Sequence, residues 1–134
     1  MNKEFVKYEQ ALALKELGFD EPCLFHTLKG EINFYRTSQD YFFKNSKNNI
    51  GVSAILCQQA FKWFREKHGL YTEIFVDDDK TFGFLISSFI EEGRVDKPIH
   101  RGFSTYEEVE SACLSKLIEI VTSFVQSLRS DWRI

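Results

Sequence analysis

The sequence predicts an α+β fold, in which three helices pack on a single antiparallel sheet of about four strands in the chain order α-β-β-α-β-β-α. Three segments repeat apolar residues at the helical period. Two pairs of short runs rich in Phe, Ile, Val and Tyr, which favour strands, lie between those segments. Because an isolated hairpin is only marginally stable, the two predicted hairpins are expected to share one sheet that the last helix covers.

The size and composition of the chain narrow its class. Its 134 residues predict one domain, residues 1–134, and 14 Phe predict a core dominated by aromatic rings. Seventeen basic residues against 20 acidic ones give a formal net charge of -3, which opposes binding to the phosphate backbone of duplex DNA. No apolar run approaches the roughly 20 residues that span a bilayer, and the N-terminus is unlike a signal peptide. A cytoplasmic protein without a membrane partner is expected.

Two helices are predicted in the first 70 residues. The first covers residues 3–17 and the second covers residues 54–68, where Leu56 and Trp63 are expected on the core face. Gly18 and Gly69 follow these segments, where glycine supplies the left-handed residue that ends a helix.

The predicted strands form two hairpins. Residues 23–37 contain the runs CLFHTL and EINFYRT, separated by Lys29-Gly30. Leu70–Val76 and Thr81–Ile90 are the second pair, joined by a turn of three Asp and one Lys.

Two further segments are predicted as loops. Residues 38–51 combine Asn, Ser and Lys with aromatic residues, of which Tyr41 and Phe42 either fold back on the sheet edge or line a pocket or subunit contact. Residues 91–103 contain Gly, Pro and mixed charge.

The last helix has the clearest signals. Ser104 with Glu107, or Thr105 with Glu108, forms a capping box at its start. An apolar stripe of about five turns follows. It consists of Val109, Ala112, Cys113, Leu117, Ile120, Val121, Phe124 and Leu128.

Three blocks, YEQALALKELGFDEPC, QQAFKWFREKHGLYTEIFVDD followed by FGFLI, and STYEEVESACLSKLIEIV, resemble in that order a group of small uncharacterised proteins of bacteriophages and prophages of gut bacteria. The blocks cover close to half of the chain. The resemblance implies a phage-linked accessory protein in the cytoplasm of a bacterial host cell, and no catalytic residue carries over from it. The group often has Pro-Thr before the second helix, where this chain has Ile55-Leu56, so the resemblance does not fix where that helix starts.

The second predicted helix interleaves cationic and aromatic side chains. Lys62 and Arg65 alternate with Phe61 and Trp63, and cations beside aromatic rings are typical of single-strand binding. Helical periodicity also explains the pattern as a core face with a solvated face, or as a surface for a protein partner. Phe61 is the aromatic residue expected to be exposed.

The loop at residues 91–103 concentrates positive charge in an acidic protein. Arg94, Lys97, His100 and Arg101 are candidates to bind a phosphate-bearing ligand or an acidic partner, or they belong to an ordinary solvated loop.

The remaining polar groups suggest no catalytic or metal motif. Asp77-Asp78-Asp79 lacks the spacing of a calcium loop and reads as an acidic turn. His68 precedes Gly69 at a helix end, where the partial negative charge favours a cation. The three cysteines have no metal-ligand spacing and are expected as reduced, buried thiols, although a Cys–His pair assembled in space stays open. No cofactor and no metal are predicted.

The sequence therefore predicts a non-enzymatic binding or adaptor module whose partner is a host or phage macromolecule, a protein rather than a nucleic acid. A homodimer is also predicted, because Trp132 and Ile134 need apolar cover. The first alternative is a protein that binds or sequesters a nucleotide signal, with an aromatic ring such as Phe61 for the base and Arg94 or Arg101 for the phosphate. The second is a single-stranded nucleic-acid binder.

Overall fold

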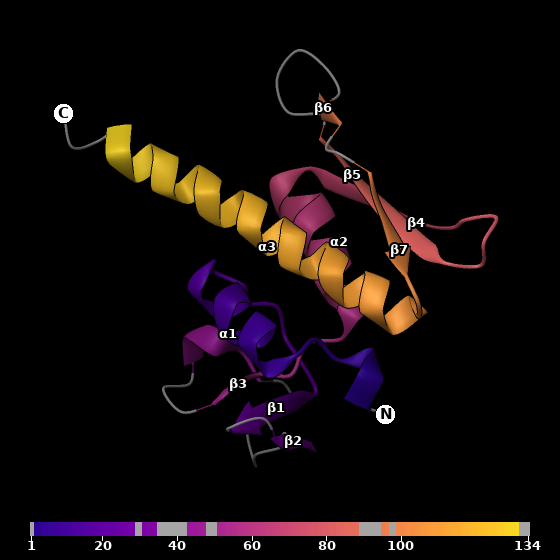
Figure 1. Cartoon of the computed structure of the whole chain (residues 1–134). Coiled ribbons are helices and arrows are strands. Elements are labelled where there is room, and N and C mark those ends of the chain that lie inside the picture. The colour runs from indigo at the N-terminus through magenta and orange to yellow at the C-terminus, as the bar shows by residue number, and fades with distance from the viewer. Residues whose placement is uncertain are drawn as a thin grey trace. The chain divides into compact units, whose positions relative to one another are not determined.

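The computed structural model describes residues 2–28, 31–34, 43–47, 51–88, 95–96 and 99–131. The chain divides into two compact units, residues 1–60 and 61–134, and each is described by itself. Helices and antiparallel strands occur together, which confirms the α+β class. The predicted single sheet is wrong, because each unit has a sheet of its own (Figure 1). One domain over the whole chain stays a prediction.

The first unit contains a short helix and a three-stranded sheet (Figure 1). Its elements are η1 (Asn2–Glu4), α1 (Tyr8–Glu16), β1 (Phe25–Leu28), β2 (Glu31–Phe34), η2 (Asn45–Lys47) and β3 (Val52–Ser53). The predicted hairpin of β1 and β2 is confirmed, and β3 adds to the other edge of β1, giving the antiparallel order β2-β1-β3.

Both of the first two helices start later than predicted, for one shared reason. The Val6 amide donates a hydrogen bond to the Ile55 carbonyl at 2.8 Å, and Phe5 forms an isolated antiparallel bridge with Leu56. This pairing holds both segments extended. Consequently α1 begins at Tyr8, and α2 (Cys57–His68) begins after Leu56, which is 42% exposed and does not join Trp63 on the core face.

The glycine that ends α1 acts as predicted. Gly18 has a φ of 97°, a conformation that glycine adopts without a Cβ penalty. The Gly18 amide bonds the Lys15 carbonyl, and the Phe19 amide bonds the Leu14 carbonyl at 2.9 Å. These two bonds make a Schellman cap, which satisfies carbonyls that the helix end would leave unpaired.

The second unit contains most of α2, a four-stranded sheet and a long helix. The strands are β4 (Leu70–Val76), β5 (Phe82–Ser88), β6 (Val95–Asp96) and β7 (His100–Phe103), and the helix is α3 (Tyr106–Asp131). The β4–β5 hairpin is confirmed, with β4 at its predicted bounds. The loop predicted at residues 91–103 is wrong in part, because β6 and β7 both pair with β5.

Helix α3 covers one face of this sheet (Figure 1). Phe82, on that face, lies 6.0 Å from Tyr106 of α3, measured between ring centroids. Val109, Cys113 and Leu117 are fully buried, as their spacing of four residues predicts. Further along the predicted stripe the side chains of Phe124 and Leu128 are exposed.

The start of α3 uses one of the two predicted capping boxes in modified form. The Glu108 amide donates to the Thr105 hydroxyl at 3.2 Å, as in a capping box. The Glu108 carboxylate accepts from the Ser104 amide, one residue before the expected partner. Thr105 is therefore the residue that caps α3.

Candidate functional site

The sheet face opposite α3 carries the most distinctive cluster of side chains in the second unit. Phe75 on β4 pairs with Gly83 on β5, and both point to this face because Phe84 beside them points to the other. The Phe75 ring lies over Gly83, where an added Cβ would be 2.6 Å from the ring and 2.7 Å from the His100 carbonyl oxygen. Gly83 thus provides the space that the ring occupies.

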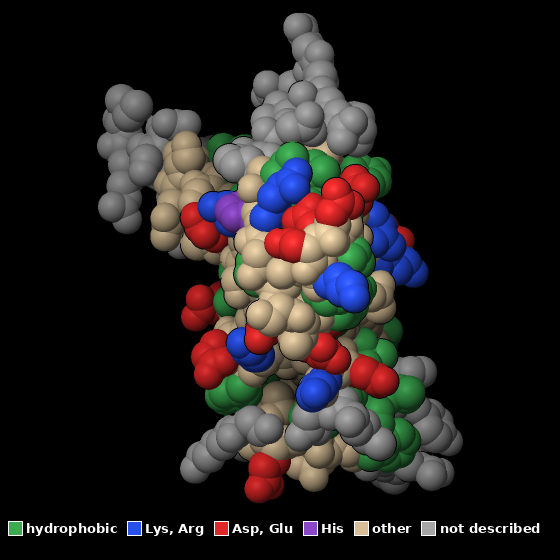
Figure 2. Space-filling model, turned by 45° about the vertical axis from the view of Figure 1, so that its right-hand side comes forward, with side chains coloured by type: hydrophobic (Ala, Val, Ile, Leu, Met, Phe, Trp, Pro, Cys, Tyr) green, Lys and Arg blue, Asp and Glu red, His purple; other side chains and the backbone are tan. Residues whose placement is uncertain are grey.

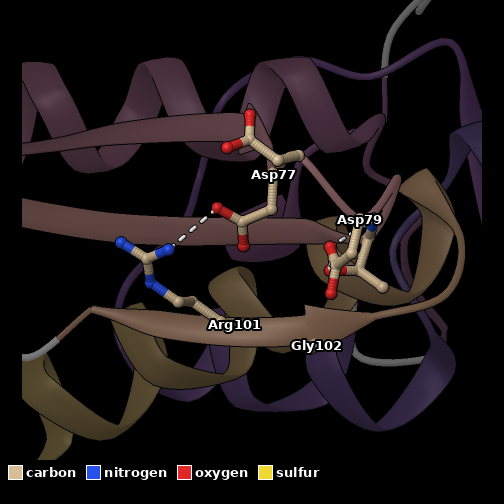
Figure 3. Close-up of a pocket in the computed structure, with 6 residues that line it drawn as sticks. Asp77, Asp79, Arg101 and Gly102 are labelled. Atoms are coloured by element: carbon tan, nitrogen blue, oxygen red, sulfur yellow. Dashed lines mark hydrogen bonds and ion pairs between the residues drawn. The ribbon is translucent and has the colours of Figure 1, made fainter.

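Arg101 reaches this cluster from β7. Its guanidinium carbon lies 5.5 Å from the centre of the Phe75 ring, and its Nη1 donates to Asp77 Oδ1 at 2.9 Å. Figure 3 shows the Arg101 side chain extending from β7 toward Asp77. The arginine therefore spans the width of the sheet, from β7 across β5 to the end of β4.

A β-bulge sets the direction of Arg101. Phe82 pairs with Phe103 and Phe84 pairs with His100, so two steps along β5 face three steps along β7. The extra residue falls at Arg101-Gly102, and Gly102 has a φ of 90°, which favours glycine. Bulges commonly reorient a side chain at a functional edge of a sheet, and here the reoriented side chain is Arg101.

The three Asp residues form the predicted hairpin turn next to Arg101. The Asp77 amide bonds the Thr81 carbonyl at 2.8 Å, and the Lys80 amide bonds the Asp77 carbonyl at 3.0 Å. Asp79 Oδ1 accepts bonds from the hydroxyl and amide of Thr81, and these bonds, the hydroxyl first, lower the pKa of the Asp79 carboxyl. The Asp79 carboxylate is thus held in place by the turn, and its lowered pKa favours the ionised form at neutral pH.

Together the turn and the bulge line an open hollow of about 470 Å³. It is lined by Asp77, Asp78, Asp79, Thr81, Arg101 and Gly102. Three carboxylates against one guanidinium make the hollow acidic, which favours a basic or mixed-charge ligand over a phosphate. Within the described residues, no three His, Cys, Asp or Glu side chains are arranged to hold a metal ion.

The Arg101–Asp77 ion pair orients the site more than it stabilises the fold. The Arg101 side chain is 59% exposed and that of Asp77 is 20% exposed. Exposed ion pairs contribute about 0–1 kcal/mol, and a cation over an exposed ring adds about as much. One of the five N–H donors of the guanidinium is used in this bond, so others can reach a ligand.

The structure separates the predicted basic cluster at residues 91–103. His100 stacks on Phe84 with ring centroids 4.6 Å apart, on the face that α3 covers, whereas Arg101 lies on the other face. Arg94 and Lys97 lie outside the described residues, as do Tyr41 and Phe42. Only Arg101 of these candidates therefore belongs to the hollow in the described structure.

The three candidate residues on α2 were all expected at the surface, but only two of them are exposed. Phe61 is only 4% exposed, so its predicted exposure is wrong. Viewed down the axis of α2 at 100° per residue, the buried side chains cover an arc of about 160°, with Trp63 at one margin and Phe61 at the other. This arc is wider than the apolar face predicted from the sequence, and it therefore includes Phe61. Lys62 and Arg65 are exposed as predicted, and Lys62 lies 3.8 Å from Glu66.

The surface charge is mixed. Figure 2 shows acidic and basic side chains interspersed over the described part of the face in view. Lys62 and Arg65 lie on α2, whose aromatic residues are buried. The exposed face of α2 therefore has no aromatic ring of its own on which a base could stack.

The predicted burial of the cysteines is confirmed. Cys23, Cys57 and Cys113 are free and buried. Burial raises the pKa of the Cys23 thiol to about 11 and that of the Cys113 thiol to about 12. Both thiols are therefore held protonated at neutral pH, which opposes a nucleophilic role.

Two residues of the site were missed by the sequence reasoning. In the sequence, Phe75 looks like any other apolar residue of a strand, and Asp77 looks like any other acidic residue of a turn, so neither was predicted to belong to a site with Arg101. Their relation to Arg101 depends on a pairing between β5 and β7 across an intervening segment. A local signal is Gly83, which follows the turn, because glycine inside a strand often marks a close approach of another group.

No helix in the described part of the chain is both long enough and apolar enough to cross a membrane. The chain matches no protein-family model, no curated protein sequence and no solved structure.

Proposed function

We propose that the chain is a non-enzymatic binding module, an adaptor or accessory protein whose partner is a host or phage protein. The observation that supports it best is the Arg101 guanidinium held over Phe75 by Asp77. Arginine and aromatic side chains are enriched where protein interfaces gain most of their affinity. Because the bulge and the ion pair already orient this arginine, a partner loses less conformational entropy on binding it.

The absence of enzymatic activity is part of the proposal, and the protonation of the thiols supports it. A catalytic cysteine needs a lowered pKa, whereas the pKa of Cys23 and that of Cys113 are raised. The link to phages and the location in the bacterial cytoplasm are proposed on the sequence resemblance.

The nucleotide-binding alternative receives less support. Phe61, its candidate ring, is buried, and Arg101 already pairs with a carboxylate in an acidic hollow. Single-strand binding receives less support for a similar reason, since the aromatic residues beside Lys62 are buried.

Self-association through α3 is proposed as a second property. Phe124 is 59% exposed and Leu128 is 46% exposed, and residues four apart lie on one side of a helix. A second copy of the chain would provide apolar cover for both. The terminal Trp132 and Ile134, on which the prediction from the sequence rested, lie outside the described residues.

The binding proposal is tested by affinity purification of the tagged protein from a lysate of its natural host. Mass spectrometry of the bound proteins and of released small molecules is done on the same sample. Arg101→Ala removes the proposed contact, and Lys62→Ala is the matched control, since it removes an exposed cation from α2 instead. We expect a stoichiometric protein with the wild type and with Lys62→Ala, and its loss with Arg101→Ala.

Three outcomes would contradict the proposal. Retention of the partner by Arg101→Ala would show that the surface around Arg101 is not the binding surface. A nucleotide released on denaturation, without a bound protein, would favour ligand sequestration. Nucleic acid that binds at low salt and dissociates steeply as salt rises would favour the single-strand alternative.

A further inference from the structure

Strand β4 lies at an edge of its sheet. Within the described part of the chain it pairs with β5 alone, through seven residue pairs from Leu70↔Ser88 to Val76↔Phe82. A seven-residue edge strand is long, and edge strands of this length can pair with another chain unless they are protected. The described residues of β4 include no proline or lysine, two of the usual protections of an edge.

The hairpin turn fixes which backbone groups of β4 face outward. Because the Asp77 amide bonds the Thr81 carbonyl, this pair is hydrogen-bonded. Hydrogen-bonded and non-hydrogen-bonded pairs alternate along an antiparallel ladder, so Phe75 and Glu73 also bond β5. The amides and carbonyls of the alternate residues therefore point away from β5. These residues are Thr72, Ile74 and Val76.

The side chains along this edge differ between the two faces of the sheet. On the α3 side, Ile74 is half-buried and Val76 is 65% exposed, so the part of that side next to the turn is apolar. On the opposite side Glu73 is exposed, and the acidic turn follows it. Around this end of β4 four acidic residues stand against two basic ones, Lys80 and Arg101.

We infer that β4 binds an extended, basic peptide segment of the protein partner as an additional strand. Backbone hydrogen bonds to the outward groups of β4 would supply affinity, as in other cases of strand addition. Lys or Arg at alternate positions would face Glu73 and the acidic turn, and apolar residues between them would pack beside Ile74 and Val76. This inference rests on the proposed binding function and adds the chemistry of the partner.

The charge of the edge favours such a segment over a second copy of β4. Two antiparallel copies centred on Glu73 would place the two carboxylates directly opposite each other, which is destabilising. Registers shifted by two residues, which keep the same face of each strand aligned, place Glu73 opposite Phe75 or Tyr71 of the other copy and leave both carboxylates without a cation. A basic segment offers each carboxylate an opposite charge instead.

The test uses a capped heptapeptide, Thr-Lys-Val-Lys-Val-Lys-Thr, which matches the seven residues of β4. Its control has Glu in place of each Lys. Hydrogen exchange of individual backbone amides is followed by NMR on the full chain. With the Lys peptide at saturation, the amides of Thr72, Ile74 and Val76 should exchange at least about tenfold more slowly, because exchange then requires release of the added strand. The Glu peptide should leave them unchanged.

Two variants separate charge from backbone pairing. Glu73→Lys should weaken the protection by the Lys peptide and allow protection by the Glu peptide. Thr72→Pro removes one outward amide and should reduce protection at Ile74, and its folding is checked by the unchanged exchange of α3 amides. If Thr72→Pro does not fold, Glu73→Lys alone decides the question.

The inference is overturned if the Lys peptide leaves the three amides unchanged, or if both peptides protect them equally. Protection that rises with protein concentration without any peptide would overturn it in favour of a second copy. Capture of a partner through Arg101 without edge protection would contradict this inference only. Edge protection by the peptide without any captured partner would contradict the binding function proposed above.

Discussion

At the scale of single residues, burial decides the protonation of His68. Its ring packs against Trp63, with centroids 4.8 Å apart, and against Phe64. Burial lowers the pKa of His68, although the position at the end of α2 would favour the charged form. Loss of hydration is thus the cause of the lowered pKa, and the preference of this helix end for a cation stays a prediction.

The lowered pKa makes stability depend on pH. In the unfolded chain His68 binds a proton as the pH falls through about 6.5, whereas in the folded chain it resists protonation. Its contribution to stability is complete above the unfolded pKa and is lost progressively as the pH falls below it. The melting temperature should thus fall more steeply between pH 7.5 and pH 5.5 for the wild type than for His68→Gln, as measured by calorimetry. Equal slopes would show that His68 is not the cause.

The residues of the candidate site differ in how well a sequence can place them. Lys62 and Arg65 are exposed as helical periodicity predicts, because that pattern depends only on neighbours along one helix. Phe61 was misplaced, since the width of the buried arc depends on what packs against α2. The pairing of Arg101 with Asp77 spans 24 residues and depends on a β-bulge. The signal for that bulge in the sequence is a single glycine, Gly102.

At the scale of elements, the β4–β5 turn contains a residue in an unfavourable conformation. Lys80 has a φ of 66°, and it is the third loop residue of a three-residue hairpin turn, where glycine is preferred. A residue with a Cβ is strained in this left-handed conformation, at a cost on the order of 1 kcal/mol.

Lys80→Gly should therefore stabilise the protein. The expected gain in the free energy of unfolding is about 0.5–1 kcal/mol, because the relief of strain is partly offset by the greater freedom of glycine in the unfolded chain. Chemical denaturation measures it. Lys80→Ala is the control, since it also removes the charge and keeps the Cβ, and it should give no gain. Equal effects of the two variants would assign the change to charge instead of backbone strain.

Elements with local signals were predicted best. β4 keeps its predicted bounds because a glycine and a tight turn delimit it. The start of α2 depends on the backbone hydrogen bond between Val6 and Ile55, which are almost 50 residues apart in the sequence. Strand β7 depends on its pairing with β5. Neither partner can be inferred from the segment itself.

At the scale of the whole molecule, two sheets replace the one that was predicted. The expectation of a shared sheet assumed that neither hairpin is stable alone. In the structure each hairpin gains a further strand within its own unit, β3 beside β1 and β7 beside β5. Each sheet therefore reaches three strands or more without the other.

Self-association is the prediction that belongs to the whole molecule. Exposed Phe124 and Leu128 on one side of α3 would be covered by the same residues of a second copy in a two-fold arrangement. Sedimentation of the wild type at micromolar concentrations should give the mass of a dimer, about twice 15.7 kDa. Phe124→Glu should give the monomer, because burying an unpaired carboxylate in an apolar contact is costly.

The matched control is Gln126→Glu, which adds the same charge on α3 about 200° around the helix from Phe124. It should keep the mass of the dimer. A wild type that sediments as a monomer would contradict self-association, and a dimer that survives Phe124→Glu would place the contact elsewhere. Since neither variant alters β4, a dimer that Phe124→Glu dissociates also separates this contact from strand addition at the sheet edge.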